Sequence, residues 1–269
     1  MAALARAGLP GLLAAACVAL GASWAGAAPP AGDVNTGQDF TQPVTRAELR
    51  VRYQRAVEED DHNTAVTARV DDISDLGGGW RLALRADLPY QWTDTPTGEN
   101  PDGELDRGLG DALVQALLVA PVGGKWAYVL GTQVILPTAR KDAMGTGKYQ
   151  LVPTLGAKYD LGQWSRGAWC GALVRHAFDV ASKDDERAHV SQTYLQPFVN
   201  ILLPRLWFLT FAPEVRYDWR EKRWFAPFDL MVGKMVSDRL VVSLEYKSAV
   251  VDDLPLYKHE VEARVGLLF

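Results

Sequence analysis

Long segments of alternating apolar and polar residues constrain the fold of this 269-residue chain more than any other feature. Residues 47–54 alternate without a break, and the same period of two runs from residue 257 to the last residue, Phe269. Successive side chains of a β-strand point to opposite faces, so this alternation predicts strands with one apolar and one polar face.

Twelve such segments follow one another after residue 44. Most of them have 11 to 14 residues, whereas strands of soluble sheets have about 5–6 and a membrane-crossing strand needs about 9–11. The predicted strands cover residues 45–57, 64–72, 78–90, 111–121, 125–137, 148–160, 167–179, 190–203, 206–219, 224–236, 239–251 and 257–269. The alternation is weakest in 64–72. Strand length therefore favours a membrane-spanning sheet.

The connections between these strands alternate in length. Short ones fall at 122–124, 203–205 and 236–238, and longer or more charged ones at 58–63, 91–110, 138–148, 181–189, 220–223 and 252–255. Membrane barrels have short periplasmic turns and longer outer loops. The expected fold class is all-β, a transmembrane antiparallel up-and-down β-barrel of about 12 strands. The longest loop, 91–110, is a candidate for an inward-folded constriction or lid.

The first 27 residues resemble a cleaved signal peptide. Arg6 precedes an apolar run from Leu9 to Leu20, and Ala25-Gly26-Ala27 fits signal peptidase. A lipoprotein anchor at Cys17 is the less favoured alternative, because the Leu expected three residues upstream is missing. The expected organisation is a signal peptide (1–27), an irregular periplasmic leader (28–44) and an outer-membrane β-barrel (45–269), located in the outer membrane of a Gram-negative bacterium.

Composition excludes several classes of protein. Arg6 is the single basic residue among the first 27, so the mature chain has 27 basic and 33 acidic side chains, and this charge argues against a nucleic-acid partner. No later segment has 18 consecutive apolar residues, which excludes a helical membrane protein. Cys170 alone remains after cleavage, so no internal disulfide is expected. We predict no metal or cofactor site.

Aromatic residues gather near the ends of the predicted strands. Trp80, Trp126 and Trp207 begin strands at the predicted periplasmic side, whereas Tyr53, Tyr90, Trp92, Tyr149, Trp219, Trp224 and Tyr257 lie at the opposite ends. Two belts of amphipathic rings suit the two headgroup layers of a membrane. The alternative is a soluble β-sandwich with core aromatics, which strand length and the signal peptide disfavour.

The polar face of these strands is expected to line the lumen with a ladder of charges. Its members are Glu48, Arg50, Arg52, Arg81, Arg85, Asp87, Lys158, Glu214, Arg216, Asp218, Glu245, Lys247, Glu260, Glu262 and Arg264. Closure of the barrel pairs the first strand with the last, which predicts the pairs Arg52–Glu260, Arg50–Glu262 and Glu48–Arg264. The last hairpin predicts Lys247–Glu262 and Glu245–Arg264. Such pairs either stabilise a filled interior or line a pore.

Four stretches are similar to a known family. They are Gly108-Leu109-Gly110-Asp111, Leu136-Pro137-Thr138, Gly145 to Pro153, and Gln196-Pro197 followed by Pro213-Glu214 and Tyr217-Asp218-Trp219. The chain thereby resembles the family labelled "putative MetA-pathway of phenol degradation", or transporter-like outer-membrane proteins, with Tyr149 where the family has Trp. Phe269 after an alternating strand resembles the terminal signature that the barrel-assembly machinery reads. The resemblance implies a barrel and a transport role.

The function expected from these features is passive passage of small solutes. One predicted inward face carries Ala127, Val129, Gly131 and Ile135 around Gln133, which suits an aromatic or hydrophobic solute. The alternatives are a structural barrel with a sealed, salt-bridged interior, and a barrel hydrolase using His176, which has no serine at a telling spacing. The expected partners are outer-membrane lipid and lipopolysaccharide, the barrel-assembly machinery and a small-molecule solute.

Overall fold

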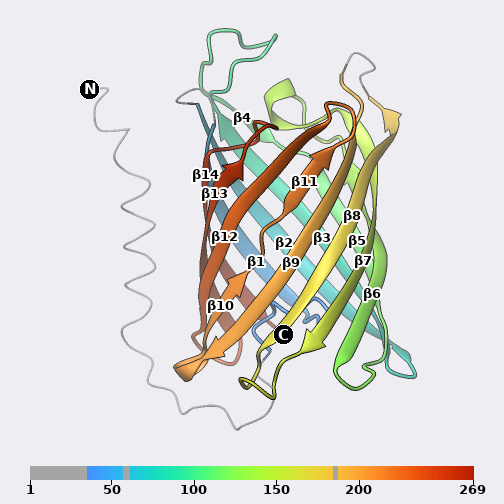
Figure 1. Cartoon of the computed structure of the whole chain (residues 1–269). Helices are drawn as coiled ribbons and strands as arrows, with labels where there is room; N and C mark the ends of the chain where they lie inside the picture. Colours follow the sequence, from blue (N-terminus) through green and yellow to red (C-terminus); the bar gives the residue numbers. More distant parts are fainter. Residues whose placement is uncertain (1–34, 57–60, 184–186) are drawn as a thin grey trace.

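The computed structural model describes residues 35–56, 61–183 and 187–269, so the predicted signal peptide lies outside the described residues. The described chain forms one antiparallel β-barrel (Figure 1). Its strands are β1 (Arg46–Arg55), β2 (His62–Gly77), β3 (Trp80–Thr93), β4 (Asp106–Leu109), β5 (Ala112–Val119), β6 (Trp126–Leu136), β7 (Lys148–Asp160), β8 (Trp169–Ser182), β9 (Ser191–Leu203), β10 (Trp207–Phe211), β11 (Val215–Asp218), β12 (Arg223–Met235), β13 (Leu240–Val251) and β14 (His259–Leu268). Two short 3₁₀ turns, η1 (Asp142–Met144) and η2 (Pro204–Leu206), lie between strands.

Twelve barrel strands account for these elements, as the sequence predicts. β4 and β5 both pair with β3 and form one interrupted barrel strand. β10 and β11 likewise lie between β9 and β12, and Pro213, which has no backbone N–H to donate, falls at their interruption. β1 pairs with β14 and closes the sheet, so no strand among the described residues is left at a free edge.

The predicted strand positions agree closely with the structure. β2 was the weakest prediction, yet it is the longest strand, with 16 residues. Its outward residues change from apolar Val66 and Val70 to acidic Asp72, and this change weakens the alternation. Pairing with β1 ends at Asp71, but pairing with β3 continues to Gly77. Pairing with a neighbouring strand, rather than local pattern, therefore extends β2.

The side chains are arranged inside out relative to a soluble protein. Large apolar side chains face outward and are exposed: Leu49, Leu84, Val114, Leu130, Leu155, Val174, Leu195, Leu230, Leu244 and Val265. Buried inward positions hold polar or charged groups: Glu48, Gln115, Gln150, Thr154, Lys158, Asn200, Asp229, Glu245 and Glu262. An apolar exterior around a polar interior is the arrangement of a transmembrane barrel, whose outer surface contacts lipid.

The two ends of the barrel differ in their connections. Strand pairs meet in tight turns at one end, called here the short-turn end, where the C-terminus also lies (Figure 1). The other end, called the loop end, carries the longer connections. In the part of the chain that the structure describes, no helix is both long and apolar enough to span a membrane.

The prediction that loop 91–110 folds inward as a lid is wrong. β3 and β4 form a paired hairpin in which Tyr90 lies opposite Leu109 and Thr93 lies opposite Asp106. Residues 94–105 project beyond the barrel (Figure 1). Strand pairing carries this loop outward, so it cannot turn into the lumen. At the same end, Met144 of η1 is buried, and its carbonyl accepts a hydrogen bond from Gln91 (3.2 Å).

Candidate functional site

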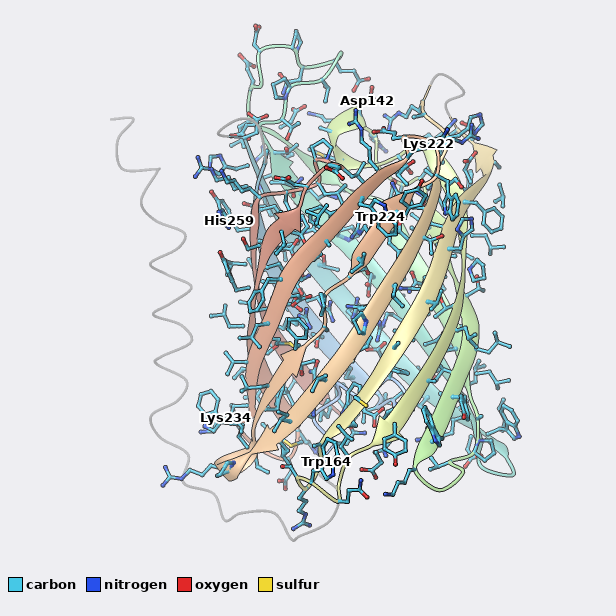
Figure 2. All side chains as sticks on the ribbon, viewed as in Figure 1. Asp142, Trp164, Lys222, Trp224, Lys234 and His259 are labelled. Carbon is cyan, nitrogen blue, oxygen red and sulfur yellow. The ribbon has the colours of Figure 1, made fainter. Side chains whose placement is uncertain are left out.

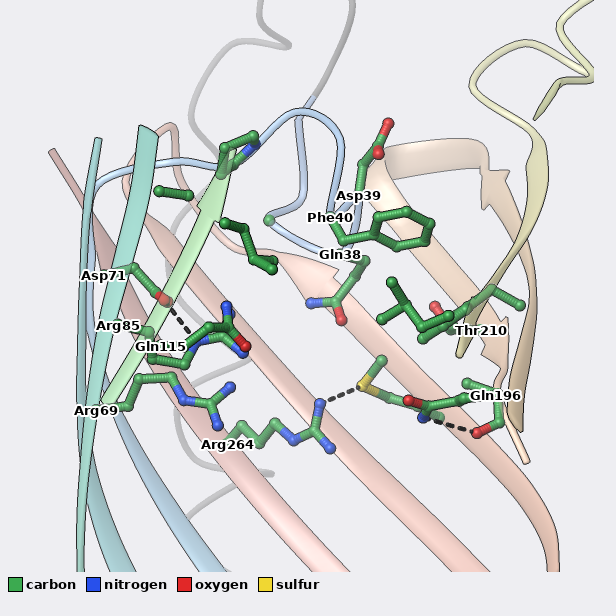
Figure 3. A pocket seen from close by; sticks show the side chains of 18 of the residues that line it. Gln38, Asp39, Phe40, Arg69, Asp71, Arg85, Gln115, Gln196, Thr210 and Arg264 are labelled. Carbon is green, nitrogen blue, oxygen red and sulfur yellow. Dashed lines mark hydrogen bonds and ion pairs between the residues drawn. The ribbon is translucent and has the colours of Figure 1, made fainter. Parts of the chain in front are cut away.

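The central lumen contains a cavity of about 300 Å³. All twelve barrel strands contribute at least one residue to its wall. Figure 3 shows arginine side chains projecting into this space from neighbouring strands, with Phe40, Gln196 and Thr210 across it. The cavity is thus a feature of the closed barrel as a whole, and its floor comes from another part of the chain.

Residues 35–44 form that floor, and they are called here the N-terminal segment. They contain no helix or strand and enter the lumen just before β1. A second cavity, also of about 300 Å³, lies on the other side and is lined by Asn35, Thr36, Lys158 and Trp169. Asp39 lines both cavities. The sequence predicted an irregular leader here, but it gave no indication that the leader occupies the barrel.

Polar contacts tie the N-terminal segment to the barrel wall. Asp39 forms an ion pair with Lys158 of β7. Arg81 of β3 donates a hydrogen bond to the Thr41 carbonyl (2.8 Å), and Thr41 itself is fully buried. Arg46 of β1 donates to the Gly37 carbonyl (3.1 Å). Three strands therefore hold this short segment, which has no secondary structure of its own.

An aromatic cluster adds an apolar anchor. The ring of Phe40 packs against Trp169 and Phe198, with centroid distances of 5.8 and 5.4 Å. Gly156 and Gly171 lie beneath it, and a Cβ at either position would approach the Phe40 ring to 3.1 or 3.3 Å. Two glycines in adjacent strands thus provide the space that the Phe40 ring occupies.

The seam between β1 and β14 has a different register from the one predicted. Arg50 lies opposite Arg264 and Arg52 opposite Glu262, so the predicted direct pairs are wrong by two residues. The last hairpin is shifted by the same amount, with Lys247 opposite Glu260. A shift of two keeps every side chain on its face. The charges therefore still meet inside the barrel, but diagonally.

Diagonal contacts connect these charges into one network, called here the seam network. Arg50 contacts Glu48 (2.5 Å) and Glu262 (3.5 Å), and Arg264 contacts Glu262 (2.6 Å) and Glu245. Acidic and basic groups alternate along it in the order Arg85, Asp71, Arg46, Glu48, Arg50, Glu262, Arg264, Glu245, Lys247 and Glu260. Each charge thus has an opposite neighbour despite the shifted register.

The other predicted ladder residues have individual partners. Asp87 pairs with Arg69, Arg216 pairs with Glu214 (2.7 Å), and Asp218 accepts a hydrogen bond from Gln192 (2.8 Å). Lys158 and Arg81 hold the N-terminal segment, as described above. Arg52 is half-buried on the same face of β1 as Arg50.

Further inward charges lie outside the ladder that the sequence predicts. They are Asp39, Arg46, Arg69, Asp71, Arg175 and Asp229. Arg69 and Asp71 belong to β2, where the outward pattern is weakest. Every second residue after Ala65 faces the same side of β2, and this rule would have identified both Arg69 and Asp71. Nothing in the local sequence indicates that Asp39 lies inside the barrel.

Most of the predicted belt aromatics are exposed near the strand ends. Trp80, Trp126 and Trp207 lie at the starts of β3, β6 and β10, and Tyr53, Tyr90, Tyr149, Trp219 and Trp224 are exposed toward the loop end, with Trp92 half-buried. Trp164, at the opposite end from Trp224, is exposed but was not predicted (Figure 2).

Tyr257 is a correction to the predicted belt. Its side chain is only 6% exposed, and its ring packs against Phe225 at 4.8 Å with Leu254 alongside. Residues 252–258 fold inward at the loop end, so alternation does not extend as far back as Tyr257. Burial, with Glu260 nearby, raises the pKa of this phenol above its ordinary value.

Comparisons with known proteins agree with the geometry. Residues 54–174 match the sequence profile of the family described as "Putative MetA-pathway of phenol degradation". An outer-membrane channel from Pseudomonas putida F1 has a similar structure, with a TM-score of 0.69, 13% identity, and coverage of 91% of this chain and 100% of the channel. No curated protein matches the sequence significantly.

Two porins share the fold more distantly. The NanC porin has a TM-score of 0.53 at 11% identity, covering 82% of this chain and 98% of the porin. The KdgM porin, solved in complex with disordered oligogalacturonate, has a TM-score of 0.52 at 8% identity, covering 83% of this chain and 99% of the porin. The resemblance stated from the sequence is thus supported by a family model over residues 54–174, and the chain has the β-barrel fold that these outer-membrane proteins share.

Proposed function

We propose that this barrel is a passive conduit through which small solutes cross the outer membrane. The central cavity carries this proposal, because it lies on the barrel axis and every barrel strand contributes to its wall. A barrel with a structural role alone needs a filled interior rather than a cavity of about 300 Å³. The channel-like fold supports the same conclusion.

The solute that we propose is small and partly apolar. Leu117, Leu173 and Phe198 line the cavity beside Phe40, so part of the wall offers no hydrogen bond. Ala127 and Val129 of β6, which belong to the apolar strip expected from the sequence, are buried but do not line this cavity. Aromatic or hydrophobic solutes suit such a wall, because apolar contact replaces lost hydration.

A sealed structural barrel is the second candidate, favoured by the N-terminal segment. Residues 35–44 lie between the two cavities, and three strands bind them. Passage requires either space beside this segment or its displacement. The proposal therefore includes a narrow or adjustable constriction at the short-turn end.

A hydrolase role receives no comparable support. The Nδ1 atom of His176 is hydrogen-bonded to Thr193 (2.9 Å), and Ser182, the serine near it in sequence, accepts a hydrogen bond from Lys148 (2.9 Å). We therefore propose that the protein is not an enzyme. Phospholipid hydrolysis by the purified barrel, lost in His176→Ala, would overturn this view.

Reconstitution tests the conduit directly. Refolded mature protein in planar bilayers is expected to give discrete conductance steps in potassium chloride, and proteoliposomes are expected to swell in small neutral solutes but not in large ones. If electrophoretic mobility shows that the barrel is folded, but the barrel gives neither conductance nor swelling, the result would favour the sealed barrel.

A further inference from the structure

We propose that the central cavity is a binding site for a small organic anion, namely a carboxylate attached to an apolar or aromatic body. This inference rests on the proposed conduit function and names the class of its solute. Two different walls of the cavity carry it: one is rich in arginine, and the other is apolar and amide-bearing.

The arginine wall spans four neighbouring strands. Arg264, Arg50, Arg69 and Arg85 come from β14, β1, β2 and β3, and all four line the cavity. Figure 3 labels Arg264, Arg69 and Arg85 in this wall. Arg264 and Arg50 even lie directly opposite each other in the ladder. Four guanidinium groups on one wall offer several N–H donors to a bound carboxylate.

Cavity-facing charges are unbalanced, although the seam network as a whole is not. Seven basic residues line the cavity (Arg46, Arg50, Arg69, Arg85, Arg175, Lys247 and Arg264), against four acidic ones (Asp39, Asp71, Glu214 and Glu245). Glu48 and Glu262 pair with Arg50, and Asp87 pairs with Arg69, but none of these three carboxylates lines the cavity. The guanidinium groups thus belong to residues that line the cavity, whereas these three carboxylates do not.

The facing wall suits the body of the ligand. Gln196 of β9 accepts a hydrogen bond from Arg175 (2.7 Å) and donates one to the Ala212 carbonyl (3.1 Å), so this amide already satisfies part of its own hydrogen-bonding capacity. Phe40, Phe198 and Leu173 offer apolar area. A planar carboxylate matches the guanidinium fork, and an aromatic ring packs on Phe40 and Phe198.

This pair of walls discriminates between anions. A sugar acid would place hydroxyl groups against Phe40 and Phe198, where no hydrogen bond replaces those lost from water. Acetate would use the arginines and leave the apolar wall unfilled. The volume of about 300 Å³ lies at the lower end of the ~300–1,000 Å³ typical of ligand sites, which suits one substituted ring.

Benzoate is the probe that tests the site. Titration calorimetry of the refolded full mature chain in detergent compares benzoate with its neutral counterpart benzamide, with acetate and with galacturonate. We expect benzoate to bind at least tenfold more tightly than each of the other three. Equal binding of benzamide, or tighter binding of galacturonate, would overturn the proposal.

A double variant removes one cation without leaving its partner unpaired. Arg69→Gln with Asp87→Asn deletes an entire ion pair, and we expect at least tenfold weaker benzoate binding. The matched control, Arg223→Gln with Glu221→Gln, removes an exposed pair (3.4 Å) outside the lumen and should leave binding unchanged. Unheated electrophoretic mobility verifies that both variants are folded. Unchanged benzoate affinity in a folded Arg69→Gln/Asp87→Asn variant would contradict the site.

Conductance separates this inference from the conduit itself. A barrel that conducts potassium chloride but binds benzoate no better than benzamide would overturn the anion site and leave the conduit intact. A barrel that binds benzoate selectively but never conducts would support the site and contradict the conduit.

Discussion

Arg50 of β1 lies directly opposite Arg264 of β14 across the seam that closes the barrel. Glu262 contacts both arginines. Arg50 also contacts Glu48, and Arg264 also contacts Glu245. Two like charges therefore meet at the closing pair of strands, and interleaved carboxylates make this arrangement stable. Closure and the chemistry of the lumen thus depend on the same residues.

Glu262→Gln tests the importance of this interleaving. The substitution leaves Arg50 and Arg264 facing each other with one carboxylate fewer, and removal of one partner from a buried ion pair costs roughly 3 kcal/mol. We expect a loss of that size in urea unfolding of the barrel in lipid vesicles, followed by tryptophan fluorescence. Glu104→Gln, in the exposed loop after β3, is the control and should change stability by less than about 0.5 kcal/mol. Equal effects of the two substitutions would contradict a structural role for the seam network.

Phe40→Ala tests whether the N-terminal segment narrows the path. Loss of the ring removes its packing against Trp169 and Phe198, so the segment should loosen and single-channel conductance should increase at least twofold. Combination with Asp39→Asn, which also removes the ion pair to Lys158, should increase it further. Phe228→Ala, on the exposed outer face of β12, is the control and should leave conductance unchanged. Unaltered conductance in the Phe40→Ala barrel would indicate that solutes bypass the segment.

Leu130→Arg tests the lipid-facing assignment of the exterior. Leu130 is 60% exposed near the middle of β6 and lies opposite Leu155 of β7. An arginine at the bilayer midplane of a barrel costs about 2–4 kcal/mol, and the same urea titration should detect this loss. Leu105→Arg, in the loop beyond the barrel, should have little effect. If the chain were instead a soluble β-protein, both substitutions would reduce its stability by a similarly small amount.

Removal of Phe269 tests the proposed contact with the barrel-assembly machinery. This residue is exposed, and its backbone N–H donates to the Thr45 carbonyl (3.0 Å) at the start of the first strand. The proposed role is recognition rather than stability, so deletion should reduce membrane insertion in cells several-fold. Refolding of the same variant in detergent should proceed normally. A variant that inserts normally in cells would contradict this role.

The barrel could be predicted from the sequence because its period of two is a local signal. Alternation assigns each residue of β14 to a face, and the strand that ends at Leu268 follows the pattern up to the terminus. β2 was predicted too short, because its pairing with β3 continues to Gly77, beyond the region where its own pattern is clear.

Register and the contents of the lumen could not be predicted in the same way. A shift of two residues preserves faces, so the positions of Arg50 and Glu262 on the inner face were predictable while their direct pairing was not. The N-terminal segment has no periodic pattern. Its place is determined by Gly156 and Gly171, which make room for Phe40, and by Lys158, all more than one hundred residues away.

Chemical modification of a cysteine in the lumen tests the central claim most directly. Gln133→Cys in a Cys170→Ser background places a single thiol on the cavity wall, and Leu130→Cys in the same background places one on the outer face of the same strand. If solutes cross through this cavity, a charged methanethiosulfonate reagent should reduce single-channel conductance by at least half at Gln133→Cys and leave Leu130→Cys unchanged. A fully labelled Gln133→Cys barrel with unaltered conductance would contradict passage through the central cavity.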